Sequence, residues 1–245
     1  MRVKTLIVGA VCAAASIGPA YAYRPFDGTD ADVAGAGEVE VELGFLHLLR
    51  EGSQEYVVAP AAVVNFGLDN GRELVLEGRV KTPLNGATEP HRTTIEDGGI
   101  FLKQIHRHGS LQEGSGPSVA SECGLLIPTV SGERTGAGCT AIVSGRGQAG
   151  AGHVNGALNK GRDGNWERFF GVIVEGSGMV RPVGEILATH DSAGRHMASA
   201  LVGVIWTARK GLTFDVALRR ARTEEHDVTE VRIGLTWDVH AARAP

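Results

Sequence analysis

The chain has 245 residues, with 24 basic and 28 acidic side chains and a formal net charge of −4. Because it carries no excess of positive charge and no basic run, the sequence excludes nucleic acid as an expected partner. After Ile17 it holds no apolar run long enough for a membrane-spanning helix, which excludes a helical membrane protein.

The first 22 residues have the pattern of a secretory signal peptide. Arg2 and Lys4 supply positive charge, residues 5–17 are apolar, and Ala20-Tyr21-Ala22 is a small-residue cleavage site. A permanent membrane anchor is the less favoured alternative. We therefore expect residues 1–22 to be removed near Ala22 and residues 23–245 to form one domain, with 22 basic and 28 acidic residues and a net charge of −6.

The mature part begins with a polar, turn-rich stretch over residues 23–35, which predicts an N-terminal lead-in and no strand. Stretches with a two-residue alternation of apolar and polar side chains follow, and the sequence Glu-Val-Glu-Val-Glu-Leu at 38–43 shows it most clearly. Twelve strands are predicted in this way, at 37–49, 55–67, 72–82, 94–106, 117–128, 137–146, 151–160, 166–176, 180–189, 197–208, 211–221 and 230–239.

A strand that is apolar on one face and charged on the other lies between an apolar medium and a polar one. An even number of such strands, most of them 10 to 13 residues long, is typical of a transmembrane barrel with a wet interior. Short turns at 68–71, 146–150, 176–179 and 209–210 largely alternate with longer links at 83–93, 129–136, 190–196 and 222–229, although the links 106–116 and 161–165 do not fit. The predicted fold is all-β, an antiparallel up-and-down transmembrane β-barrel of about 12 strands, with helix confined to the signal peptide.

Three short motifs were weighed for enzymatic or metal chemistry. Residues 145–150 match G-x-G-x-x-G, but a strand follows where a nucleotide site needs a helix, so a hairpin turn is favoured. His106 and His108 could share a strand face, but no Cys, Asp or Glu accompanies them, so a solvated turn is favoured over a metal site. The nearest match to a serine-hydrolase elbow, at 116–120, ends in Ala120. We expect no catalytic residues, no metal and no cofactor.

Cys123 and Cys139 are the cysteines of the predicted mature chain. A disulfide between them could form in an oxidising compartment, but two cysteines do not make a disulfide framework. The favoured interpretation is that they are isolated apolar strand residues.

Charged side chains on the inward face should pair across the lumen or be hydrated, because a bare charge in a low-dielectric site is costly. Such charges would set the field of a pore, and the alternative is that they only brace a closed barrel. The predicted lumen-lining residues are Glu38, Glu40, Glu42, Glu73, Glu77, Arg79, Glu122, Asp215, Arg219 and Arg232.

Residues 24–78, Phe101-Leu102-Lys103, residues 114–122 and residues 214–219 resemble a family of proteobacterial outer-membrane barrels that are labelled transporters of the phenol-degradation meta-pathway type. The resemblance implies a β-barrel, a location in the outer membrane of a Gram-negative bacterium and a role in solute uptake. Its implied partners are outer-membrane lipid and the barrel-assembly machinery. One departure is the tail 238–245, which follows Trp237 where such barrels end on an aromatic residue.

We therefore predict an outer-membrane channel or transporter for the passive uptake of small solutes, with the solute unassigned and phenol not carried over as a ligand. The alternatives are a non-conducting structural or partner-binding barrel and a soluble secreted β-protein.

Overall fold

The computed structural model describes residues 24–84, 93–129 and 133–240, with only the backbone of His240. The predicted signal peptide, most of the link 83–93 and the end of the C-terminal tail lie outside these residues. Twelve strands follow one another along the chain: β1 (Glu38–Glu51), β2 (Gln54–Leu68), β3 (Arg72–Pro83), β4 (Thr94–Arg107), β5 (Ser118–Leu126), β6 (Gly136–Gly147), β7 (Gly150–Lys160), β8 (Trp166–Gly176), β9 (Val180–Asp191), β10 (His196–Arg209), β11 (Leu212–Thr223) and β12 (Asp227–His240).

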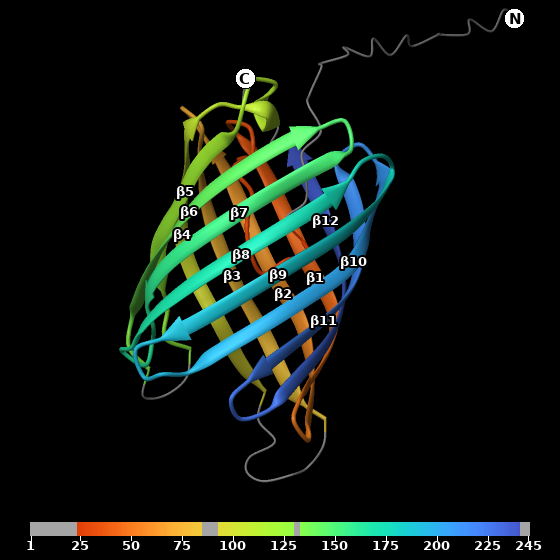
Figure 1. Ribbon diagram of the computed structural model, residues 1–245. Coiled ribbons are helices and arrows are strands. Elements are labelled where there is room, and N and C mark those ends of the chain that lie inside the picture. The colour runs from red at the N-terminus through yellow and green to blue at the C-terminus, as the bar shows by residue number, and fades with distance from the viewer. Residues whose placement is uncertain (1–23, 85–92, 130–132, 241–245) are drawn as a thin grey trace, which may run out of the picture.

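The strands form a closed barrel, as the sequence predicts. Each strand pairs antiparallel with its neighbours in the chain, and β1 closes the ring by pairing with β12 (Figure 1). Closure leaves no free sheet edge, so strand pairing is complete around the ring. The prediction of an antiparallel barrel with about 12 strands is confirmed.

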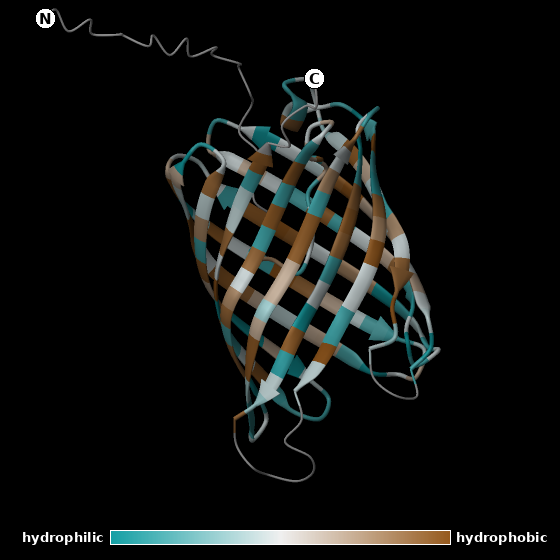
Figure 2. Cartoon of the chain, turned by 180° about the vertical axis from the view of Figure 1, so that it is seen from behind, coloured by the Kyte–Doolittle hydropathy of each residue, from teal (hydrophilic) through white to brown (hydrophobic). Residues whose placement is uncertain are grey.

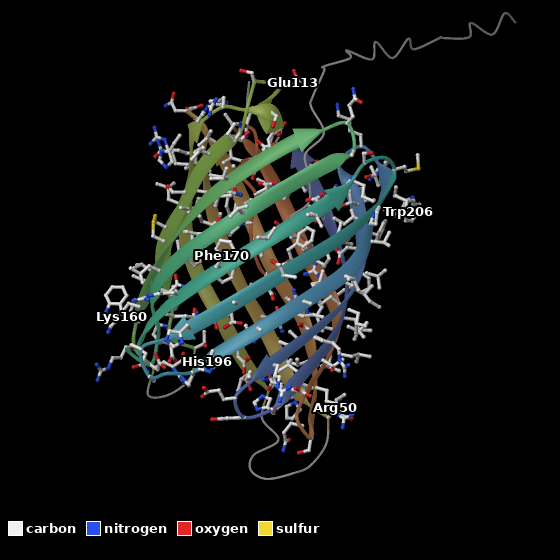
Figure 3. All side chains as sticks on the ribbon, viewed as in Figure 1. Arg50, Glu113, Lys160, Phe170, His196 and Trp206 are labelled. Atoms are coloured by element: carbon white, nitrogen blue, oxygen red, sulfur yellow. A yellow bond between two sulfur atoms is a disulfide. The ribbon has the colours of Figure 1, made fainter. Side chains whose placement is uncertain are left out.

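The alternation in the sequence separates an outer face from an inner one. On β11, Asp215 is 5% exposed and faces the lumen, whereas its neighbour Val216 is 49% exposed on the outside. Figure 2 shows the resulting change of hydropathy along the strands, and Figure 3 shows Phe170 and Trp206 outside the barrel wall. Large apolar side chains are exposed on most strands, and a surface of this kind requires an apolar surrounding medium.

β1 begins and β12 ends at one end of the barrel, here called the terminus end; the opposite end, where β1 turns into β2, is the loop end (Figure 1). Several strands extend further than the sequence predicts, so the connections after β9 and β11 shrink to residues 192–195 and 224–226. On the terminus end the long link 108–117 contains a short 3₁₀ helix, η1 (Ser110–Gln112), which corrects the expectation that helix is confined to the signal peptide.

The length of this link has a structural reason. The side-chain amide of Gln112 donates to the carbonyl oxygen of Ala31 at 2.8 Å and to Asp32 Oδ1 at 3.1 Å. The link thus reaches over the rim and holds the segment that precedes β1. The link 161–165, which also fitted the predicted alternation poorly, is a short turn between β7 and β8.

A β-bulge in β1 reverses the faces of its second half. Gly44 pairs with Gly234 and Leu46 pairs with Ile233, so Phe45 is an additional residue, and it is exposed to the outside. An extra residue shifts every later side chain to the other face. As a result His47, not Leu46, is buried in the lumen.

Cys123 and Cys139 form a disulfide, so the favoured interpretation of two isolated cysteines is wrong. The two residues lie directly opposite each other on β5 and β6, where Cβ atoms of cross-strand neighbours come close enough to be bridged. The segment 145–150 contains the tight turn of the β6–β7 hairpin and the strand ends that flank it, as the prediction of a hairpin requires. His106 contacts Ser121 at 2.7 Å. Within the described residues, no helix has the length and apolar character needed to cross a membrane.

Candidate functional site: the barrel lumen

The segment 24–37 runs inside the barrel before the chain enters β1 (Figure 1, red). Having no strand partner, its backbone is bound by side chains of the wall. Asn155 of β7 makes two such bonds, accepting from Thr29 N and donating to Thr29 O, each at 2.8 Å. Ala31 N donates to Ser144 Oγ at 2.9 Å, and Ala34 N donates to Glu73 Oε2 at 2.7 Å. Polar wall residues thus replace the sheet partners that this backbone lacks.

An apolar contact fixes the middle of the segment. Ala31 is fully buried against Leu111 of η1, Ala120 of β5 and Ile142 of β6. The segment and the link 108–117 therefore pack on each other at the terminus end.

The beginning of the segment joins a cluster of charged wall residues, called here the charge cluster. Asp27 accepts from Arg232 Nη2 at 2.7 Å and lies 2.7 Å from Arg219 Nε. Arg24 Nε lies 3.3 Å from Asp215 Oδ2. Because opposite charges stand in direct contact, this side of the lumen is filled by paired ions. The charge cluster consists of Arg24, Asp27, His47, Asp215, Arg219, Glu230 and Arg232.

His47 links the segment to the wall. Its Nδ1 donates to Glu230 Oε1 at 3.1 Å, and its Nε2 accepts from Arg24 Nη2 at 3.0 Å. Arginine can only donate, so these partners require the neutral imidazole with its proton on Nδ1. Glu230 in turn accepts from Arg232 Nη2 at 2.8 Å, which satisfies the second carboxylate oxygen.

On the opposite side of the segment lies a cavity of about 340 Å³, called here the chamber. Its lining contains eight carboxyl groups and only two basic groups, Arg24 and Lys103. Lys103 lies 3.5 Å from both Asp30 and Glu73, so its charge is already balanced. Phe26, Phe101 and other apolar residues complete the walls.

Four carboxyl groups of the chamber make no ion pair with a basic side chain of the described residues: Glu40, Glu42, Glu77 and Glu122. Asn65 donates to Glu40 Oε1 at 3.0 Å and to Glu42 Oε1 at 3.1 Å, which orients these two without neutralising them. Carboxylates that share one site repel each other. A cation in the chamber would relieve this repulsion, whereas an anion would increase it.

A second cavity, of about 350 Å³, lies at the loop end and is called here the vestibule. It shares Glu77, Leu126 and Asn159 with the chamber, so the two cavities meet at these residues. The other residues of the vestibule are Asp97, Gly161, Arg162, Asp163, Asn165, Glu167, Asp191 and Arg195.

The turn at the vestibule rim holds an ionised carboxylate. Asp163 accepts hydrogen bonds from the backbone and side-chain amides of Asn165, both at 2.9 Å, and from the guanidinium of Arg195. These donors, the backbone N–H first among them, lower the pKa of Asp163 to about 2. The rim therefore keeps this negative charge over the physiological pH range.

The structure places the predicted lumen residues as follows. Glu40, Glu42, Glu73, Glu77 and Glu122 line the chamber, and Asp215, Arg219 and Arg232 belong to the charge cluster. Arg79 pairs with Glu96 at 3.2 Å and with Asp97 at 2.9 Å. Glu38 begins β1, and its backbone N donates to Gly35 O at 2.8 Å.

Sequence reasoning missed other lumen residues. Lys103, Glu185 and Glu230 each have an apolar neighbour (Leu102, Ile186 and Val231), so counting the alternation on β4, β9 and β12 could have found them. His47 could not be found in this way because of the bulge before it. Within residues 24–84, 93–129 and 133–240, no group of three His, Cys, Asp or Glu side chains could hold a metal ion.

Comparisons with known proteins agree with this architecture. No protein-family model and no curated protein matches the chain. Among solved structures, the COG4313 outer membrane channel from Pseudomonas putida F1 superposes with a TM-score of 0.60 at 9% identity, over 88% of this chain and 100% of that one. A KdgM porin superposes with a TM-score of 0.54 at 8% identity, over 83% and 99%. At such identities the similarity shows the fold.

Proposed function

We propose that the protein is a channel of a bacterial outer membrane that passes small solutes and favours cations. The observation that carries this proposal is the pair of neighbouring cavities inside the barrel. The vestibule lies at the loop end and shares Glu77, Leu126 and Asn159 with the chamber, and four carboxyl groups of the chamber make no ion pair within the described residues. The belt of exposed apolar side chains on the outside suits a bilayer.

The location and delivery of the protein are part of this proposal. Residues 1–22 would serve as a signal peptide cleaved near Ala22, and the barrel-assembly machinery would insert the mature chain into the outer membrane. The two similar structures, a porin and an outer membrane channel, support a channel role. We also propose that the protein belongs to the family labelled as meta-pathway transporters, but we do not assign it that family's substrate.

The segment 24–37 restricts passage through the channel. It lies between the chamber and the terminus end and is bound by side chains from most of the wall. A solute larger than water that enters from the loop end therefore stops in the chamber unless the segment shifts. The proposed channel conducts weakly at rest and more strongly when the segment is displaced.

The same segment favours one competing function, a non-conducting barrel. Single-channel recording in planar bilayers separates the two. We expect the folded protein to give small, cation-selective currents, and Asp27→Asn combined with Arg24→Gln to give larger ones, because these changes remove the ion pairs of Arg24 and Asp27 with Asp215, Arg219 and Arg232. If neither protein conducts, the channel proposal fails. Heat-modifiable migration of both proteins on a gel provides the control for folding.

A further inference from the structure

The outer surface near the loop end carries arginines without protein partners. Arg168 of β8 and Arg220 and Arg222 of β11 are exposed, and their positions alternate with lumen-facing residues, so they point outward. None of the three makes a hydrogen bond or an ion pair with another residue of the described chain. An arginine that faces lipid costs about 2–4 kcal/mol at the bilayer midplane and close to zero at the interface. The three arginines must therefore lie at the depth of the lipid headgroups.

Strand register brings two histidines and these arginines into one patch. Arg168 lies opposite His190, and His190 lies opposite His196, so the three form a row across β8, β9 and β10. The rings of His190 and His196 stack with centroids 5.6 Å apart. Figure 3 shows His196 near the loop end of the barrel. We call Arg168, His190, His196, Arg220 and Arg222 the basic patch.

Small residues occupy the centre of the patch. Arg222 pairs with Ala198, which pairs with Ala188, and Arg220 pairs with Ala200. Register places β11 three strand spacings, about 14 Å, from Arg168, with Arg222 two residues and Arg220 four residues further toward the terminus end. His190 and His196 lie between Arg168 and β11, and the alanines beside them leave the arginines of β11 open to a headgroup.

The charged and apolar side chains around the basic patch indicate the kind of ligand. Two acids lie near it: Glu224, which contacts His196 at 2.7 Å, and Asp227, which pairs in register with Arg222 without an ion pair. The arginines are thus left for an external anion. Toward the membrane centre the outward residues become apolar, with Phe170, Ile186 and Val202 between 56% and 64% exposed. The surface is cationic at the headgroup level and apolar directly beside it.

We propose that the basic patch binds the phosphate groups of an anionic lipid of the outer leaflet, whose acyl chains lie over Phe170, Ile186 and Val202. Guanidinium forks match phosphate oxygens, and basic clusters at the membrane surface attract anionic headgroups. Outer-membrane barrels have short periplasmic turns and longer extracellular loops, so the loop end, with the links after β3 and β5, faces the outer leaflet. In a Gram-negative outer membrane, the phosphorylated lipid of that leaflet is lipid A. The inference rests on the proposed outer-membrane location, but it does not depend on conduction.

Native mass spectrometry of the folded barrel tests the proposal by counting bound lipid. The probes are lipid A and the zwitterionic phosphatidylethanolamine, each added at equal concentration. We expect the protein to prefer lipid A. Arg220→Gln with Arg222→Gln should weaken its binding about thirtyfold, because each basic side chain at an anionic surface contributes on the order of 1 kcal/mol.

Two further variants make the test specific. Arg209→Gln with Lys210→Gln removes the same charge from the terminus end and should leave lipid A binding unchanged, whereas Arg220→Lys with Arg222→Lys should retain most of it. Equal affinity for both lipids, or equal losses in the two glutamine pairs, would overturn the inference. Channel currents measured on the same preparations show separately whether the proposed function holds.

Discussion

Release of the segment 24–37 from the wall can be tested with a single charge removal. Asp27 contacts Arg219 and Arg232, each at 2.7 Å, and it joins the segment to β11 and β12. The substitution Asp27→Asn keeps the size of the side chain but removes its charge. We expect it to raise the fraction of molecules in which the segment has left its place, while the barrel stays folded.

The magnitude follows from the two contacts. A hydrogen bond to a charged group contributes about 1.5–3 kcal/mol, and the lower end applies because the Asp27 side chain remains 24% exposed. Two such contacts make a difference of about 3 kcal/mol, which multiplies the open population about 150-fold. Both arginines keep Glu230 as a partner, so the wall itself should be little affected.

The assay is thiol labelling at Ala31→Cys, a position that is fully buried between η1, β5 and β6. A water-soluble maleimide can reach this thiol only when the segment opens, so the labelling rate follows the open population. Adding Asp27→Asn should raise the rate by about two orders of magnitude. Asp69→Asn, in the turn after β2, is the matched control and should leave the rate unchanged. Equal labelling rates in Ala31→Cys alone and in Ala31→Cys with Asp27→Asn would refute the role assigned to these ion pairs.

Three further outcomes are expected. Reversing Glu40 and Glu42 to Lys should shift ion selectivity toward anions, and an unchanged reversal potential would remove these residues from the conducting path. Glu230→Gln should lower the free energy of unfolding in urea by about 3 kcal/mol, because it leaves buried arginines with fewer partners; an unchanged midpoint would contradict this. The pKa of Asp163 is lower in the folded protein than in the unfolded chain, so its stabilisation of the rim turn is complete above pH 4 and is lost as the pH falls through about 2. Hydrogen exchange of the Asn165 amide should therefore accelerate as the pH falls through about 2. The variant Asp163→Asn should show no such acceleration.

The strands could be predicted from sequence because their signal is local. On β11 the alternation of Thr213, Asp215, Ala217 and Arg219 with apolar neighbours states directly which face each residue occupies. The same rule fails at β1 after Phe45, since the extra residue of the bulge reverses the faces and brings His47 into the lumen. In a single sequence, a bulge of this kind looks the same as a strand with an irregular alternation.

The internal position of the segment 24–37 could not be predicted for a different reason. Its polar, turn-rich sequence excludes a strand but says nothing about what surrounds it. The contacts that place it inside the barrel join residues far apart in the chain, such as Asp27 with Arg232 and Thr29 with Asn155. The bridge between Cys123 and Cys139 likewise depends on the register of β5 and β6, which the sequence leaves open.

The reversal potential of the folded, unmodified protein in a planar bilayer under a KCl gradient tests the central claim most directly. The chamber holds four carboxyl groups that make no ion pair in the described structure, and its two basic groups are paired with other carboxylates. The account predicts a measurable current with a reversal potential toward the equilibrium potential of K⁺. A current that reverses toward the equilibrium potential of Cl⁻ would contradict it.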